Sequence, residues 1–167
     1  MTSSNDSLNE RVASSVQKLA LVATDLNSAS DELGQAISNI DIVLQALNIG
    51  LPTWTSIEAG DGLPDEEYYW HRDLGYAKIG SKWGIALRVV SGNYNFPDDE
   101  SSDSWLFNDA PRWLRMEGIA RIPELLEELI KTTEVATKKI KTKTSEANQL
   151  AIVIAQAAGK KLSQGSK

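Results

Sequence analysis

The only histidine of this 167-residue chain, His71, stands beside Arg72 and Asp73, and these three side chains could support acid–base chemistry. An imidazole moves protons near neutral pH, and a neighbouring carboxylate can orient it as a general base. A hydrolytic site would also need a nucleophile, but the sequence has neither a cysteine nor a Gly-x-Ser-x-Gly turn. A lone histidine beside opposite charges is more often a surface or pairing residue, so we prefer a structural role for His71.

The letters His71-Arg72-Asp73-Leu74 also open the catalytic loop of protein kinases. In that loop an Asn five residues after the Asp binds a metal ion, whereas Lys78 occupies this position in the present chain. The sequence also lacks an Asp-Phe-Gly motif and a Gly-x-Gly-x-x-Gly loop. Kinase-type phosphoryl transfer is therefore excluded.

Three charged clusters are candidates for metal or phosphate binding. Residues 61–67 and 98–103 are acidic, but neither has the ligand spacing of a calcium-binding EF-hand, so no metal or cofactor site is predicted. Four lysines lie within residues 137–144. Because the whole chain is acidic, with a net charge of −6 and an isoelectric point of about 4.8, nucleic acid is a poor candidate partner. We interpret these lysines as a solvated helix face.

Aromatic residues are the remaining candidates for binding. All eleven lie between Trp54 and Trp113, and three are adjacent in the stretch EEYYWHR at residues 66–72. Neighbours on a strand point to opposite faces, so at least one ring is expected at the surface, where aromatic and arginine side chains often form hot spots. Packing of the rings in a core is an equally good interpretation. The predicted interaction surface comprises Tyr68, Tyr69, Trp70, His71, Arg72, Trp83 and Arg88.

These side chains must be positioned by the elements around them, and residues 1–48 are predicted to form one long helix. Apolar residues recur every seven positions from Val12 to Leu47, with companions four positions later, over about five heptads. The adjoining positions are also mostly apolar, which favours a helix that packs on more than one side, as in a bundle. Gly50 and Pro52 would stop this helix.

A second long helix is predicted over residues 122–160, followed by a flexible tail at 161–167. Pro123 suits its first turn, and a heptad seam runs along it with weak positions at Thr133 and Lys143. If the two helices form an antiparallel pair within the chain, the numbers of facing residues sum to about 170. Asp31 and Glu32 would then face Lys138 and Lys139, which supports this register.

Residues 49–121 are predicted to form a small head between the helices. A short strand is expected at 54–57, and residues 74–79 and 82–90 form a hairpin around Gly80-Ser81. An Asp- and Ser-rich loop and a short helix at about 109–120 would complete the head. The predicted fold is therefore α+β and mainly α, with two long antiparallel helices, as a coiled-coil or bundle stalk, flanking a small antiparallel β-sheet head.

The sequence favours a non-enzymatic interaction module, such as an adaptor, regulator or inhibitor, whose stalk presents the aromatic head to a protein partner. The wide apolar seam predicts a homo-oligomer through the stalk. The alternative is a small-molecule binder or small enzyme with a pocket around His71 and Asp73, between head and helices. A cytoplasmic protein is expected, because neither a secretory signal nor an apolar run of about 18 residues is present.

Overall fold

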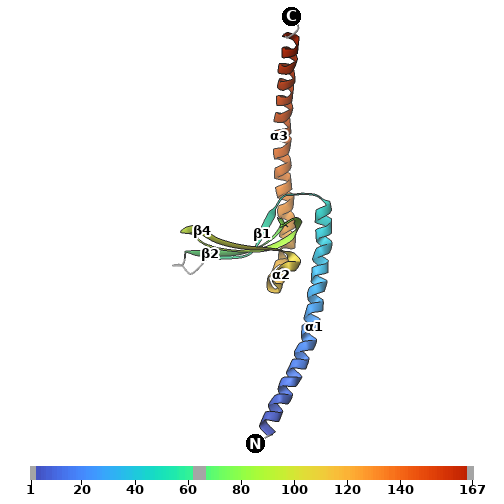
Figure 1. The fold of residues 1–167 in the computed structure, drawn as a ribbon, viewed down its shortest axis with the longest axis vertical. Helices are drawn as coiled ribbons and strands as arrows, with labels where there is room; N and C mark the ends of the chain where they lie inside the picture. The colour runs from blue at the N-terminus through green and yellow to red at the C-terminus, as the bar shows by residue number, and fades with distance from the viewer. Residues whose placement is uncertain (1–2, 62–66, 165–167) are drawn as a thin grey trace.

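The computed structural model describes residues 3–61 and 67–164, which form two long helices and a four-stranded antiparallel sheet (Figure 1). Helix α1 spans Ser3–Ala46 and helix α3 spans Ile122–Gln164. The short helix α2, Arg112–Gly118, lies between 3₁₀ turns at Phe107–Asp109 and Ile119–Arg121. The predicted α+β class with two long helices, an antiparallel sheet and a short helix is confirmed.

The sheet has the simplest antiparallel order, β1-β2-β3-β4. Its strands are Thr53–Asp61, Tyr68–Ile79, Lys82–Asn93 and Phe96–Leu106. The hairpin predicted around Gly80 joins β2 and β3, with Ile79 paired to Lys82. Gly80 has φ of 60°, a backbone conformation that glycine adopts without steric cost.

The Asp- and Ser-rich segment that the sequence predicts as a loop is in fact strand β4. Its register runs from Ser101 opposite Ser91 to Leu106 opposite Ala86. Residues 98–104 are exposed. The usual apolar alternation of a strand is therefore missing, and the charged side chains suit an edge that must not pair with other chains.

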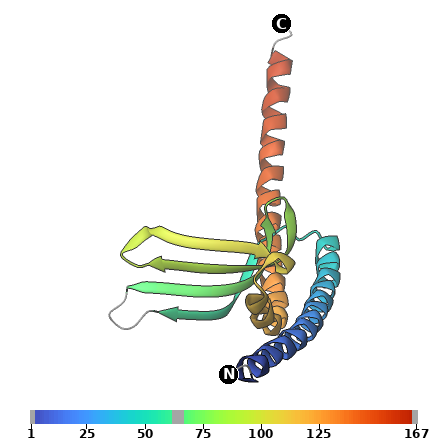
Figure 2. The ribbon, with the colours of Figure 1, turned by 60° about the horizontal axis from the view of Figure 1, so that its bottom comes forward.

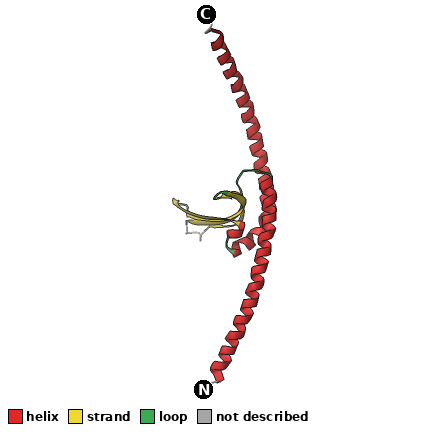
Figure 3. Ribbon diagram, turned by 45° about the vertical axis from the view of Figure 1, so that its right-hand side comes forward, coloured by secondary structure: helices red, strands yellow, loops and turns green. Residues whose placement is uncertain are grey.

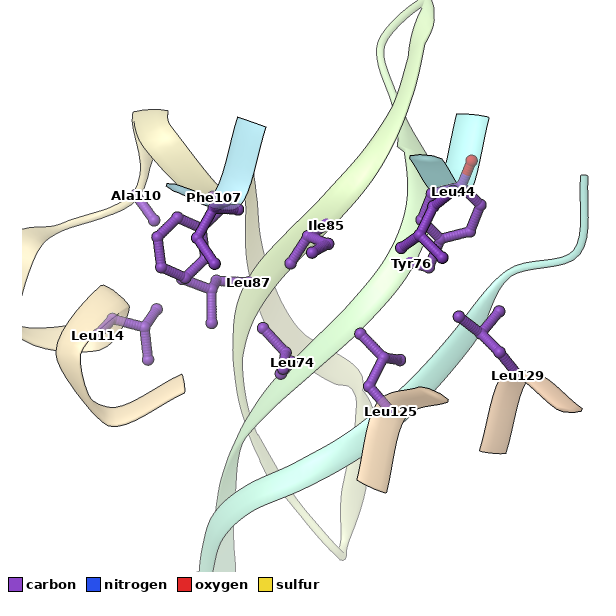
Figure 4. Close-up of a cluster of buried hydrophobic side chains, with 11 residues drawn as sticks. Leu44, Leu74, Tyr76, Ile85, Leu87, Phe107, Ala110, Leu114, Leu125 and Leu129 are labelled. Atoms are coloured by element: carbon purple, nitrogen blue, oxygen red, sulfur yellow. The ribbon is translucent and has the colours of Figure 1, made fainter. Parts of the chain in front are cut away.

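The core lies between one face of the sheet and parts of all three helices (Figure 4). Side chains alternate between the two faces along β2 and β3, so every second residue points towards the helices. The fully buried members on the strands are Leu74, Tyr76, Ile85 and Leu87. They meet Ile37 and Leu44 of α1, Leu114 of α2, and Leu125 and Leu129 of α3.

Helix α1 also closes an open edge of the sheet. Strand β4 stops pairing at Ala86, so the preceding residues of β3 have no strand on that side. The Ile85 N–H donates to Asp41 Oδ1 at 2.6 Å, and Gln45 Nε2 donates to the Trp83 carbonyl at 2.8 Å. Two side chains one helical turn apart thus replace the hydrogen bonds of a missing strand.

The predicted antiparallel pairing of the two long helices is wrong. Ser30 of α1 accepts a hydrogen bond from Arg115 of α2, which precedes α3, whereas Leu47 lies beside Ile130 within α3. Residue numbers therefore increase together, the helices run in the same direction, and the termini lie at opposite ends of the molecule (Figures 1 and 3). A heptad pattern identifies the face that needs covering, but it carries no information on the direction or identity of the cover.

Only part of the α1 seam is covered within the chain. Ser30, Ile37 and Leu44 are buried against the head. Residues 8–26 extend beyond the head at one end and residues 134–158 of α3 extend beyond it at the other (Figure 3). We call these segments the α1 arm and the α3 arm.

Candidate functional site

The predicted acid–base residues lie on the sheet face that points away from the core. Asp73 Oδ2 accepts from Arg88 Nε at 2.7 Å and contacts His71 Nδ1 at 2.8 Å. The Asp73 side chain is only 7% exposed, while those of His71 and Arg88 are about 30% exposed. The Arg88 guanidinium also lies 4.2 Å from the Trp54 ring centre, a cation–π contact. The Asp73 carboxylate thus binds His71 on its own strand and Arg88 on the adjacent strand, which is typical of a structural ion-pair network.

Arg72 lies on the opposite face, where it joins the sheet to α2. Its guanidinium carbon is 4.9 Å from the Trp70 ring centre and 4.8 Å from that of Trp113. The same group donates to Glu58 at 3.0 Å and to Glu117 at 3.1 Å. Arg72 is therefore fully engaged with two rings and two carboxylates of its own chain.

The aromatic side chains of the sheet lie over glycines on neighbouring strands. Gly60 pairs with Trp70, Gly75 with Trp54, and Gly92 with Tyr69. A Cβ added to any of these glycines would come within 3 Å of the facing ring. The glycines therefore provide the space in which the rings pack flat on the sheet, which favours the structural interpretation of most aromatics in this set.

The far end of the sheet extends sideways from the helices (Figure 2). Tyr68 and Phe96 are each about 60% exposed there. Tyr69 packs against Tyr94 with ring centres 4.8 Å apart, and its hydroxyl donates to Glu100 at 2.6 Å. That hydrogen bond raises the pKa of the Tyr69 hydroxyl. Of the predicted aromatics, Tyr68 is the one that is clearly presented to solvent.

Trp83 lies at the other end of the sheet, stacked on Tyr76 with ring centres 5.5 Å apart. Both rings line a groove of about 490 Å³ beside the end of α1. Asp41 and Lys82 also line it. Burial raises the pKa of the Asp41 carboxyl, although its hydrogen bond from Ile85 acts in the opposite direction.

The seven residues of the predicted interaction surface therefore do not form one surface. Tyr68, Trp70, Arg72 and Trp83 share the face of the sheet that continues from the core. Tyr69, His71 and Arg88 point to the other face. Trp83 is also separated from the others along the sheet, since it pairs with Lys78 near the turn.

The exposed apolar side chains are instead concentrated on the two arms. Those of the α1 arm are Leu8, Val12, Val16, Leu19, Leu21, Val22 and Leu26, each roughly half or more exposed. Those of the α3 arm are Val135, Ile140, Leu150, Ile152, Val153 and Ile154. Monomeric proteins rarely expose contiguous apolar surface of this extent. Heptad positions in the sequence were the signal for most of the α1 residues and for Ile140, Leu150 and Ile154.

Two apolar grooves lie along the helices of the head, one next to each arm. The first, of about 230 Å³, begins at Leu26 and lies between α1 and α2, where Met116 contributes to its wall. The second, of about 580 Å³, lies between Leu44 of α1, with Leu47 just after the helix, and Ile130 of α3. Thr133 and Glu134 extend this groove to the start of the α3 arm.

The charged clusters of the sequence lie on separate parts of the chain. Of the acidic segment 61–67, residues 62–66 lie outside the described residues, and segment 98–103 lies along β4. Among the described residues, His, Asp and Glu side chains do not gather in groups of three suited to a metal. The lysines of residues 137–144 lie on the exposed α3 arm. Within the described ranges, none of the helices has the length and hydropathy to cross a bilayer.

Comparisons of the chain with protein-family models, curated proteins and solved structures find no match. The burial and exposure of its own side chains are therefore the basis on which a function is proposed.

Proposed function

We propose that the chain is a non-enzymatic protein-interaction module, in which two helical arms bind other helices and a small head holds the arms in place. The observation that carries this proposal is the exposure of heptad positions along both arms; Leu19, for example, is 66% exposed. Helices in proteins owe most of their stability to packing of an apolar face, so each arm gains stability from a partner.

The head supports this role in two ways. The core and the α1–sheet hydrogen bonds at Ile85 and Trp83 fix the directions in which the arms leave. The far end of the sheet presents the exposed rings of Tyr68 and Phe96, away from the helices, as a second contact surface. The polar groups that could do chemistry, His71 and Asp73, bind each other and Arg88, which supports a structural role for them.

Affinity purification of two matched variants tests the proposal. Leu19→Glu places a charge in the apolar stripe, whereas Gln17→Glu adds the same charge two positions away, on the far side of the helix. Both side chains are exposed, so neither change disturbs the head. A protein, either another copy of the chain or a different protein, is expected to bind the wild type and Gln17→Glu, and to be lost from Leu19→Glu.

Circular dichroism verifies that both variants fold. If folded Leu19→Glu retains the same bound proteins as the control, then the arms are not the binding elements and the proposal is wrong.

A further inference from the structure

We infer that the partner of the arms is a second copy of the chain, inverted so that each α1 arm packs antiparallel along the α3 arm of the other copy. This inference rests on the proposed function, because it requires that the arms bind helices. It adds the identity of the partner, the direction of pairing and the register.

The extent of the apolar surface favours a partner as long as the chain itself. Exposed apolar residues follow the α1 arm to Leu26, where the first groove begins. The second groove extends the apolar surface from Leu47 to Ile130, and the exposed Ile140 side chain extends it along the α3 arm. The sheet lies on one side of this line of helices, and both arms bend towards that side (Figure 3). A second copy can cover both arms at once and close the assembly.

The directions of the helices determine which arms meet. Because α1 and α3 run the same way, a two-fold axis perpendicular to them brings each α1 arm beside the partner's α3 arm. The two-fold relation repeats this contact at the other end, so both arms of both chains are covered by one type of interface. Two copies in the same orientation would instead place α1 beside α1 and α3 beside α3.

Charge distinguishes these two arrangements. The α1 arm, residues 8–26, carries two acids and two bases, net zero, whereas the α3 arm, residues 134–158, carries two acids and four bases, net +2. Two more acids, Asp31 and Glu32, follow the α1 arm along the helix. Copies in the same orientation would bring the lysines 138, 139, 141 and 143 of two α3 arms together. The inverted arrangement instead places these lysines beside an α1 segment that has no net positive charge and that includes Asp25, Asp31 and Glu32, and charges beside a helical seam select pairing direction in this way.

The structure also gives the register. Leu47 lies level with Ile130, so with about 1.5 Å rise per residue the two helices together form one rod of roughly 115 Å. If two inverted rods overlap along their full length, the numbers of facing residues sum to about 168. Asp25 then lies level with the partner's Lys143, and Glu32 lies near the partner's Lys138. The charge pairing that the sequence predicts within one chain is thus formed between two chains.

Site-specific crosslinking tests this arrangement, and the chain has no native cysteine to interfere. Ala23→Cys and Ala147→Cys lie in the two seams, and both alanines are exposed in the single chain. Within one chain these positions are about 60 Å apart along the helices, so a short thiol crosslinker can join them only between chains. One pool of each variant, differing in tag length, is mixed, unfolded in urea, refolded and crosslinked.

The expected product contains one chain of each variant, and light scattering of the wild type gives twice the 18.3 kDa chain mass. Ala157→Cys is the register control, because it lies about 15 Å further along the α3 arm and is expected to crosslink poorly with Ala23→Cys. Products joining two Ala23→Cys chains in place of mixed ones would overturn the antiparallel direction, and equal yields with Ala157→Cys would overturn the register.

A wild-type chain that keeps the single-chain mass, together with no mixed crosslink between Ala23→Cys and Ala147→Cys, would overturn the inference as a whole. The proposed function is judged separately. If the chain is monomeric and Leu19→Glu still loses a different protein that Gln17→Glu retains, the arms bind another partner and only the second-copy inference fails.

Discussion

Replacing Asp41 tests how α1 is attached to the sheet. In Asp41→Ala, the Ile85 N–H loses the acceptor that it now has at 2.6 Å. Ile85 is 1% exposed, and an unsatisfied buried backbone donor costs about 1–3 kcal/mol. The groove beside Asp41 can admit water to the freed amide, so we expect the loss in free energy of unfolding in the lower half of this range, about 1–2 kcal/mol.

Asp41→Asn is the matched control, because its side-chain oxygen can still accept from Ile85. Burial raises the pKa of the Asp41 carboxyl above its ordinary value of 3.8, so the folded chain favours the protonated form. The stability that follows from this shift is fully present below pH 3.8 and is lost as the pH rises through the pKa of the folded chain. The stability of the wild type relative to Asp41→Asn should therefore decrease from acidic to neutral pH.

Urea unfolding followed by tryptophan fluorescence is a suitable assay, since all five tryptophans lie in the sheet and α2. We expect Asp41→Ala to unfold at lower urea than the wild type, and Asp41→Asn to unfold at equal or higher urea at neutral pH. If the alanine and asparagine variants are equally destabilised, the hydrogen-bond acceptor does not attach α1 and the reasoning is refuted.

Two further predictions concern the core and the far end of the sheet. Leu125→Ala should lower the free energy of unfolding by about 2–5 kcal/mol, because Leu125 is fully buried, whereas Leu126→Ala, at an exposed position, should cost far less; equal losses in urea unfolding would contradict the core assignment. Glu100→Ala, which removes the acceptor, should lower the pKa of Tyr69 towards its ordinary value of 10.0, seen as a phenolate absorbance titration absent from Tyr69→Phe. The stability linked to this raised pKa is present below pH 10.0 and is lost as the pH rises through the pKa of the folded chain; an unchanged titration in Glu100→Ala would exclude the hydrogen bond as its cause.

The sequence predicts those parts of the fold that depend on local patterns. Heptads locate both helices and mark Ile37 and Leu44 as residues that need burial, and Gly80 marks the central turn. Strand β4 has no such pattern, because its Asp- and Ser-rich segment gains its place from pairing with β3 rather than from burial. The direction of α1 relative to α3 is also not encoded in either heptad pattern.

The candidate site divides in the same way. Exposed rings and exposed seams are both predicted from residue type, yet the packing of Trp54 over Gly75 depends on a strand register that becomes known only from the folded sheet. Asp41 is not singled out by sequence reasoning for the same reason. Its role arises because β4 stops at Leu106, more than 60 residues further along the chain.

The same-direction overlap of α1 and α3 also has a mechanical consequence. The two termini lie at opposite ends of the rod, so a pull on them loads the junction between the helices in shear (Figure 1). The junction resists through the buried side chains of Ile37 and Leu44 and through the two hydrogen bonds that α1 makes to β3. These contacts must yield together before the helices can slide past each other. In a single chain, the contacts between α1 and the head therefore determine the force at which the two helices slide apart and the molecule lengthens.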